Sequence, residues 1–310
     1  MAASSVIDIK GLSKIYGRGG NSLVALDKLT LQVQPGEIFG YLGPNGAGKT
    51  TTIRVLLDLI RPSSGSATIF GMDARQQSVE IHQRIGFLPG ELSLWQGRSG
   101  MQVIHYVASV RGDIKRTVKQ AEELAARLKL DTSKKVRDLS SGNKRKLGLV
   151  IAMMHSPDLL ILDEPTNGLD PLVQQTFHEL MHEFRDKGKT VFLSSHVLSE
   201  VQAICDRVGI LRDGDLKAVQ TVDALTNVEF RWVHVQFRGG VPADVAQGLR
   251  SLPAVSEFQA EGANARMRLQ GDFDPLLRAI AAGYVEQLHV EEPTLEDIFL
   301  AYYSGEGESA

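Results

Sequence analysis

A glycine-rich loop at residues 43–51 carries the clearest chemical signal in the sequence. It fits the pattern of a glycine, any four residues, a glycine, a lysine, and a serine or threonine. Glycines let the backbone curl until several N–H groups converge on one anion, and a following helix adds the positive end of its dipole. The lysine brings a point charge to the β- and γ-phosphates, and the threonine offers a hydroxyl to Mg²⁺. We therefore predict a site for a nucleoside triphosphate with magnesium, formed by Gly43, Pro44, Asn45, Gly46, Ala47, Gly48, Lys49, Thr50 and Thr51.

A second chemical feature is a pair of adjacent acids, Asp163 and Glu164, which closes the apolar run 159–162. A strand that is apolar on both faces is typical of the middle of a parallel sheet with helices on both sides, and ligands collect at the carboxyl ends of such strands. In-line phosphoryl transfer needs a cation, a lysine and an acceptor for the proton of the attacking water. The alternative interpretation is a strand that simply ends in solvated acids. It is common where one acid follows a strand, but it explains two adjacent acids beside a phosphate loop poorly.

The periodicity of the chain predicts the elements that position these residues. Alternation predicts antiparallel strands within residues 6–33, and an apolar strand at 38–42 leads into the loop. The spacing of apolar residues after the loop predicts a helix at 51–60. The other predicted strands are 69–71, 85–88, 190–194 ending at His196, and an edge strand at 208–211. This alternation of strands and helices indicates an α/β fold with a mixed sheet.

Two further parts of the chain have a different pattern. Helical spacing of apolar residues within about 92–155 predicts a mostly helical subdomain inserted into the nucleotide-binding core. Beyond residue 225 the pattern changes to that of a small α+β domain at 226–304, followed by a tail at 305–310 that we expect to be disordered. Within that domain, strands are predicted at 230–237, 255–259, 265–269 and 285–290, and helices at 243–252, 275–282 and 294–303.

The composition bounds the class of protein. Of the 310 residues, 43% are hydrophobic and 23% are charged, as in globular proteins, and the net charge of −3 gives no bulk attraction to nucleic acid. The apolar run 147–154 is less than half as long as a bilayer span, and residues 1–10 lack the order of a signal peptide, so we expect a cytosolic location. Cys205 is the only cysteine, which excludes an internal disulfide and favours a buried thiol.

Residues 6–225 together resemble the ATP-binding cassette (ABC) ATPases, the motor subunits of membrane transporters. The resemblance implies a phosphate-loop NTPase core of the ABC type with an antiparallel β subdomain and a helical subdomain. It also implies that Asp163 and Thr50 hold Mg²⁺, that Glu164 is the general base, and that His196 reaches the γ-phosphate of ATP beside Lys49. A lone histidine is more often structural, but its place after a strand beside the acid pair favours function.

Other motifs of the same resemblance predict a dimer. Residues 138–143 occupy the place of the family's signature motif, in which Ser140, Ser141 and Gly142 would contact ATP held by a second subunit at the start of a helix at about 144–154. Asp170 is similar to the D-loop aspartate, which crosses the dimer interface. Tyr16 is placed like the aromatic that stacks on adenine, although a turn-packing tyrosine fits the same position.

Two departures from the family pattern concern the Q-loop and the signature. Where the family has glutamine after a proline, this chain has Gly90 followed by Glu91, so either the glutamate supplies a carboxylate one position late or the contact is absent. In the signature, Ser141 replaces a glycine and Asn143 a glutamine, while Gly142 is retained. Because the loop lysine, both acids and the histidine are present, we expect hydrolysis to be retained.

The run 292–300 resembles the drug-exporter branch of the family, in which ATPase and permease are separate chains. It predicts a homodimeric ATPase at the cytoplasmic face of the cell membrane, attached through an integral permease. Such a subunit would drive efflux of a hydrophobic drug or lipid-like compound and carry a regulatory C-terminal domain. The alternatives are an importer ATPase and a cassette ATPase acting on nucleic acid or ribosomes. We expect no nucleic-acid partner, because the chain has one cassette and no basic arm.

Overall fold

The structure is a computed structural model that describes residues 5–17, 22–226 and 230–291. The chain divides into two units, residues 1–222 and 223–310, and each is described by itself. The predicted helix at 294–303, the exporter-like run 292–300 and the predicted tail at 305–310 lie outside the described residues.

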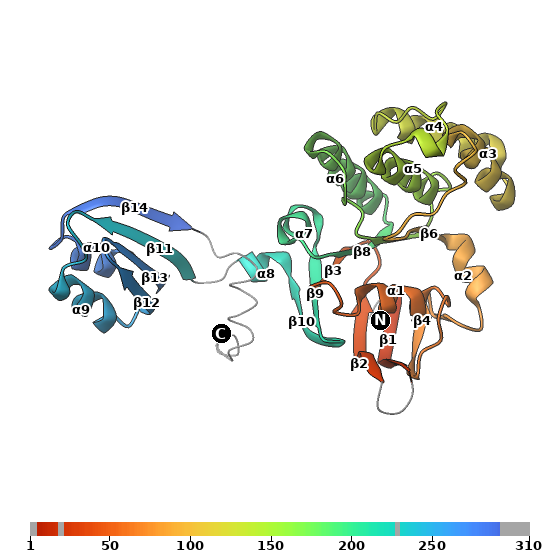
Figure 1. The fold of residues 1–310 in the computed structure, drawn as a ribbon. Helices are drawn as coiled ribbons and strands as arrows, with labels where there is room; N and C mark the ends of the chain where they lie inside the picture. Colours follow the sequence, from red (N-terminus) through yellow and green to blue (C-terminus); the bar gives the residue numbers. More distant parts are fainter. Residues whose placement is uncertain (1–4, 18–21, 227–229, 292–310) are drawn as a thin grey trace. The chain divides into compact units, whose positions relative to one another are not determined.

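The first unit begins with an antiparallel sheet, in which the strands follow the order β2-β1-β4-β5 (Figure 1). This confirms the strands predicted within residues 6–33. The strand predicted at 69–71 is wrong, because Phe70 and Gly71 both have positive φ angles, 55° and 75°, and make the turn between two strands. The members of this sheet are β1 (Ile7–Tyr16), β2 (Leu23–Val33), β4 (Ser64–Ile69) and β5 (Met72–Asp73).

A mixed sheet of six strands forms the centre of the first unit, in the order β10-β9-β3-β8-β7-β6. Its strands are β3 (Ile38–Leu42), β6 (Ile85–Leu88), β7 (Leu159–Asp163), β8 (Thr190–Ser195), β9 (Arg207–Arg212) and β10 (Asp215–Thr221). Neighbours are parallel except β10, which pairs antiparallel with β9. The strand predicted at 208–211 is therefore confirmed as β9, but its predicted place at the sheet edge is wrong. The turn at Asp213 and Gly214 returns the chain, so β10 takes the edge.

Helix α1 (Lys49–Leu56) lies between the two sheets (Figure 1). Its apolar side chains Ile53 and Leu56 belong to one buried cluster with Ile9 of β1 and Ile161 of β7. The helix predicted at 51–60 starts earlier and ends earlier, because Asp58 has a φ of 51°, which a right-handed helix does not allow.

Helices α5 (Ser141–Met153), α6 (Pro171–Asp186) and α7 (Leu198–Ile204) cover the other face of the mixed sheet (Figure 1). The packing there is close: a Cβ at Gly40 of β3 would lie 2.7 Å from Val201 of α7. Burial raises the pKa of the Cys205 thiol at the end of α7, which agrees with the predicted buried thiol. The sheet thus has helices on both faces, as the doubly apolar strand β7 predicts.

The helical segment between β6 and β7 contains α3 (Gly100–Arg111), α4 (Ile114–Arg127), the short 3₁₀ turn Val136–Asp138 and α5. Ser99 and Gln102 form a capping box at the start of α3, and Asp113 caps α4. The helix predicted at about 144–154 starts three residues earlier, because the Ser140 side chain accepts from the Asn143 N–H and caps α5. Helix α2 (Ser78–Arg84) was not predicted.

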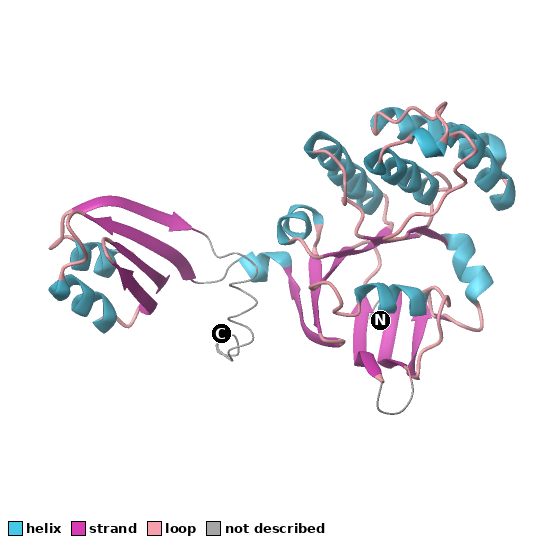
Figure 2. Ribbon diagram, in the orientation of Figure 1, coloured by secondary structure: helices cyan, strands magenta, loops and turns pink. Residues whose placement is uncertain are grey.

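The second unit pairs β11 (Phe230–Phe237) with β12 (Val255–Glu261), β13 (Asn264–Gln270) and β14 (Val285–Glu291) in an antiparallel sheet of order β12-β13-β11-β14. Helices α9 (Ala243–Ser251) and α10 (Asp274–Ile280) cover one face (Figure 2). Val233, Leu249 and Leu276 lie in its separate core. The chain order is the split βαβ arrangement of ferredoxin-like folds. The predicted elements between 230 and 290 agree to within two residues at each end.

None of the helices within the described ranges is long and apolar enough to span a membrane. The short helix α8 (Val222–Thr226) joins the end of β10 to the second unit.

Candidate active site

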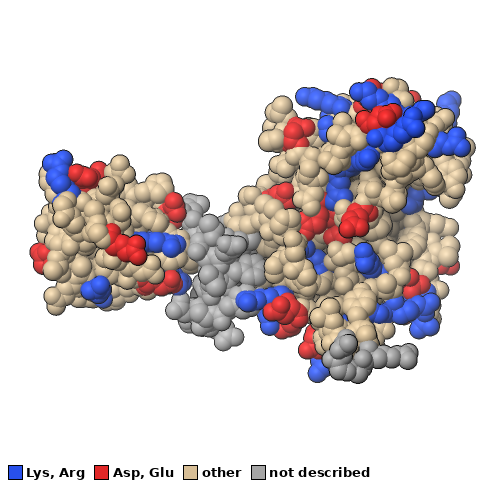
Figure 3. Space-filling model, viewed as in Figure 1, with Lys and Arg blue, Asp and Glu red and all other residues tan. Residues whose placement is uncertain are grey.

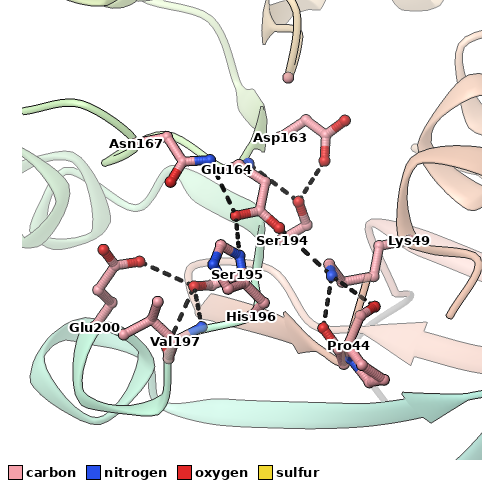
Figure 4. Close-up of polar contacts among 12 residues, drawn as sticks. Pro44, Lys49, Asp163, Glu164, Asn167, Ser194, Ser195, His196, Val197 and Glu200 are labelled. Carbon is pink, nitrogen blue, oxygen red and sulfur yellow. Dashed lines mark hydrogen bonds and ion pairs between the residues drawn. The ribbon is translucent and has the colours of Figure 1, made fainter. Parts of the chain in front are cut away.

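The candidate site lies where three neighbouring parallel strands end. β3, β8 and β7 are adjacent, and their register pairs Leu42 with Ser195 and Asp163 with Ser194. The phosphate loop follows β3, the acid pair ends β7, and His196 follows β8. The strand order therefore brings three segments that lie far apart in the sequence to one edge of the sheet (Figure 4).

Two glycines of the phosphate loop leave no room for a side chain. Gly48 has a φ of 109°, and a Cβ there would lie 2.6 Å from the Ala25 carbonyl oxygen. At Gly43 a Cβ would lie 2.3 Å from the Leu211 carbonyl oxygen. Helix α1 begins directly after Gly48, so its free N–H groups face the loop. The loop therefore opens a helix N-terminus, an arrangement that suits an anion.

Lys49 is held folded back along this loop. Its side chain is only 6% exposed, and Nζ donates to the carbonyl oxygens of Gly43 at 2.6 Å and Pro44 at 3.2 Å. The same ammonium lies 3.4 Å from Oε1 of Glu164 (Figure 4). The lysine thus places its charge between the loop and the second acid.

Asp163 is buried and holds two hydroxyl groups. Oδ2 accepts from Thr50 Oγ1 at 2.9 Å, and Oδ1 accepts from Ser194 Oγ at 2.5 Å. Thr50 and Asp163 were both predicted as magnesium ligands, and the structure brings their oxygens into contact. Carboxylate and hydroxyl oxygens are the donors that this hard cation prefers, so the residues fit Mg²⁺.

Glu164 projects its carboxylate between the loop and β8. Oε2 lies 2.5 Å from Nδ1 of His196 and accepts from Asn167 Nδ2 at 3.4 Å (Figure 4). Its backbone has a φ of 52°, a region that non-glycine residues rarely adopt. The Glu164 N–H donates to both the carbonyl and the hydroxyl oxygen of Ser194, at 3.2 and 3.1 Å. The neighbouring strand therefore fixes the direction of this acid.

The turn that carries His196 is held by its neighbours. Ser195 Oγ donates to Glu200 Oε2 at 2.9 Å and accepts from the Val197 N–H at 2.9 Å (Figure 4). Ser195 is fully buried, while His196 is 37% exposed on its side chain. The histidine can thus face both Glu164 and a ligand arriving from solvent.

A pocket of about 450 Å³ joins these groups and opens to solvent. Tyr16, at the end of β1, lies on its rim with 36% of its surface exposed, as a stacking platform for a base would. The Lys14 ammonium lies 5.0 Å from the same ring, so the tyrosine also packs within its own strand. The lining residues are Tyr16, Leu23, Ala25, Pro44, Asn45, Gly46, Gly48, Lys49, Thr50, Thr51, Gly90, Asp163, Glu164, Asn167 and His196.

At the predicted Q-loop, the two candidate residues differ. Gly90 lines the pocket, and a Cβ there would lie 3.0 Å from Oδ2 of Asp163. Glu91 is exposed and lies outside the lining. The structure thus brings the glycine, rather than the glutamate, to the acid pair.

The predicted signature residues open α5, and the predicted D-loop aspartate opens α6. Ser140 and Ser141 are exposed, and none of the signature residues lines the pocket. A Cβ at Gly142 would lie 2.5 Å from the Gly168 carbonyl oxygen, so this glycine is required by packing within the chain. Asp170 caps α6 by accepting from the Val173 N–H at 3.1 Å. The turn is preformed on the D-loop but apart from the phosphate loop.

Comparisons with known proteins identify the family. The profile described as "ABC transporter" matches residues 26–167. The bacitracin transport ATP-binding protein of Bacillus licheniformis is 40% identical over 217 residues, 69% of each chain. The chain belongs to the ABC transporter ATP-binding subunits. It is therefore an ATPase that binds ATP and serves a transporter.

Two further relatives of this ABC ATPase match over nearly the whole chain. The bacitracin transport ATP-binding protein of Enterococcus faecalis is 30% identical over 318 residues, 99% of each chain. The Nod factor export ATP-binding protein I of Cupriavidus metallidurans is 33% identical over 302 residues, 96% of this chain and 97% of the relative.

Solved structures show the same fold as the first unit of the ABC ATPase. The ATP-binding subunit of an ABC transporter superimposes with a TM-score of 0.65 at 29% identity, covering 71% of this chain and 92% of the other. A dimeric ATP-binding cassette in a post-hydrolysis state with ADP and Pi gives 0.64 at 22% identity, covering 70% and 98%. These likenesses confirm the predicted α/β cassette fold.

The sequence alone did not assign contacts to Ser194 and Asn167. Both lie in motifs that were predicted, but the bonds they make to the acid pair of this ABC ATPase come from the structure. The signal for Ser194 was its place at the end of an apolar strand. It pairs with Asp163 only because β7 and β8 are neighbours, which the strand order decides.

Proposed function

We propose that this ABC ATPase drives an exporter, and that Glu164 is the general base of ATP hydrolysis. The observation that carries the proposal is the position of its carboxylate, 2.5 Å from His196 Nδ1 and 3.4 Å from Lys49 Nζ. A carboxylate there can accept the proton of a water that attacks the γ-phosphate. The histidine orients the carboxylate beside the γ-phosphate, and the lysine balances the charge of the phosphate oxygens.

Thr50 and Asp163 would hold Mg²⁺, because their oxygens already converge. When bound, the cation would supply positive charge that stabilises the phosphate oxygens. Ser194 keeps Asp163 oriented through its hydroxyl, so the carboxylate presents its other oxygen to the side of the loop. Tyr16 would stack on the adenine at the rim of the pocket.

We infer that a second copy of the chain completes each site. The exposed turn at Ser140, Ser141 and Gly142 opens α5, so free N–H groups of a helix N-terminus face outward there. Such a turn suits the γ-phosphate of an ATP held by the other copy, with Asp170 at the same interface. A solved cassette of the same fold is a dimer with ADP and Pi bound, which supports this arrangement.

The surface of α3 supports a separate permease as the other partner. Trp95 and Tyr106 are 52% and 55% exposed and meet edge to face at 4.7 Å. They line a groove of about 630 Å³ with Met101, Gln102 and His105. Exposed aromatic side chains beside a groove mark interaction surfaces. A cytoplasmic helix of an integral permease would dock there and hold the ATPase peripherally at the cytoplasmic face of the cell membrane.

One relative is named for Nod factor export, which supports outward transport, and two are named for bacitracin transport. We propose a hydrophobic drug or lipid-like compound as the substrate class, and a regulatory role for residues 226–304. Acidic and basic side chains are interspersed over the visible face of the first unit (Figure 3). This distribution does not favour a nucleic-acid partner at that face.

The proposed export can be tested in cells that carry the gene for this chain. Deleting the gene should raise the cellular accumulation of hydrophobic antibiotics, and the intact gene should restore efflux. Alleles with Lys49→Ala or Glu164→Gln should fail to restore it, although the chain is present at normal level. Reduced uptake in the deletion strain would contradict the export proposal, and restored efflux with Glu164→Gln would contradict the assignment of the base.

A further inference from the structure

Arg145 lies in the second turn of α5 and is almost fully buried, with 5% of its surface exposed. Its guanidinium uses all five of its N–H groups as donors, and every acceptor is a backbone carbonyl oxygen. Nε donates to Pro165 at 3.3 Å, Nη1 to Pro89 at 2.8 Å and Gly90 at 2.9 Å, and Nη2 to Asp163 at 2.6 Å and also to Glu164.

These five carbonyls belong to two segments of the active site. Pro89 and Gly90 form the Q-loop, and residues 163–165 carry the acid pair. Arg145 itself belongs to the helix that the signature turn opens. One side chain therefore connects three segments, at a position of the Q-loop where glycine has no side chain to make a contact.

The buried guanidinium of Arg145 is surrounded by backbone carbonyl groups and lies near two acids. Burial lowers the pKa of Arg145, and the nearby charges of Asp163 and Glu164 oppose that shift. Five carbonyl dipoles replace the water that the guanidinium loses on folding. A lysine has only three donors and no fixed fork, so it cannot reproduce this set.

The bond to Glu164 bears on the conformation of the proposed base. Glu164 has a φ of 52°, and its N–H is held by Ser194 of β8. Its carbonyl oxygen accepts from Arg145 Nη2. Both peptide groups of this residue are thus fixed in a backbone region that side chains rarely adopt, and this fixes the direction of the carboxylate.

We propose that Arg145 is a positioning residue for ATP hydrolysis, which acts by holding the backbone of Glu164 so that its carboxylate faces His196 and Lys49. The inference rests on the proposed role of Glu164 as the base. It follows that Arg145 contributes to the hydrolytic step but not to the affinity for ATP.

The test replaces Arg145 by Lys and by Gln in the full chain. Each variant should lower kcat about 10- to 100-fold, because a displacement of about 1 Å at the reacting group has that effect, while KM and ATP binding change less than about twofold. Arg111→Lys is the matched control. Arg111 also donates to two backbone carbonyls, those of His82 and Ile85, but to neither the Q-loop nor the acid pair. It should keep kcat within about twofold of the unmodified chain.

A double-mutant cycle separates positioning from a general structural role. If Arg145 acts through the Glu164 carboxylate, adding Arg145→Lys to Glu164→Gln should change the residual single-turnover rate by less than about twofold. An equal fold loss in both backgrounds would overturn the inference, as would an unchanged kcat for Arg145→Lys alone. Failure of both Arg145 variants to fold would also overturn it, since the residue would then serve the fold. If Glu164→Gln itself retained hydrolysis, the proposed base would fail instead.

Discussion

The phosphate-loop side and the signature side of the first unit are both proposed to contact ATP, but they are built differently. Glu164 contacts both Lys49 and His196 within one chain, and Asp163 beside it accepts from the hydroxyl groups of Thr50 and Ser194. Ser140 at the signature turn is exposed, and its hydroxyl accepts from the Asn143 N–H at the start of its own helix. The phosphate-loop side is thus a pocket within one chain, and the signature side is an exposed surface.

The difference follows from the elements that carry each side. Three adjacent parallel strands end together, so the sheet itself brings the loop, the acids and the histidine to one edge. The signature turn opens α5, and close packing of Gly142 on Gly168 fixes the turn. From this difference we expect that binding and the chemical groups for hydrolysis belong to one chain, whereas the proposed closure over the γ-phosphate needs a second chain.

The largest effect should come from the base on the pocket side. Glu164→Gln should lower kcat about 10³-fold and leave the Kd for Mg-ATP within about twofold, because the amide cannot accept the proton but keeps the shape. Phosphate release and equilibrium ATP binding measure the two quantities. Glu183→Gln, which removes an exposed partner of Arg127, is the control and should hydrolyse normally. An unchanged kcat in Glu164→Gln would contradict the assignment of the hydrolytic base to the phosphate-loop side.

On the signature side, Gly142→Ala should lower kcat about 100-fold without loss of ATP binding. The new Cβ would meet the Gly168 carbonyl oxygen at 2.5 Å and displace the turn, at a cost in stability of about 1–3 kcal/mol. Gly97→Ala is the matched control, because nothing lies within 4 Å of a Cβ there. Hydrolysis rates and thermal unfolding check both variants. Equal loss of ATP affinity and of kcat in Gly142→Ala would show that the turn also forms the binding pocket.

A smaller effect is expected at the rim of the pocket. Tyr16→Ala should raise the Kd for ATP about tenfold, since stacking of a base on an aromatic ring is worth about 1–3 kcal/mol. Tyr16→Phe retains the ring and should bind within about twofold of the unmodified chain. Titration with a fluorescent ATP analogue distinguishes the variants. Identical affinities for Ala and Phe would assign Tyr16 to packing beside Lys14 instead.

The smallest effect concerns the opposite end of α5. Burial, with help from Arg111, lowers the pKa of His155 to about 4. The unfolded chain binds this proton near pH 6.5, so the stability that the neutral histidine contributes is present above pH 6.5 and is lost as the pH falls toward 4. Between pH 7 and 5 the loss should be about 1–2 kcal/mol.

Urea unfolding at the two pH values measures this loss. His155→Gln, which keeps a donor for the Ile85 carbonyl oxygen, should show a smaller pH dependence. An unchanged dependence would place the titration elsewhere. Because this end of α5 faces the core of its own chain, hydrolysis per folded molecule should not change.

Sequence reasoning located more of the contacting residues on the phosphate-loop side than on the signature side. The types and spacing of Lys49, Thr50, Asp163 and Glu164 each specify one chemical role, and the strands that carry them are strongly apolar. It could not predict that β10 rather than β9 takes the sheet edge, because that depends on pairing between segments. The reason for Gly142 was also incomplete, since its contact with Gly168 depends on how α5 packs. Arg145 had no sequence signal, because its partners are backbone atoms.

The central claim is that each ATP is closed over by the signature turn of a second chain, and mixing two inactive variants tests it most directly. Lys49→Ala breaks the pocket and keeps the turn, while Ser140→Tyr blocks the turn and keeps the pocket. Each alone should be inactive, but an equal mixture should recover about one quarter of the unmodified activity, because half of randomly formed dimers contain one intact site of two. A mixture no more active than its separate components would contradict the account.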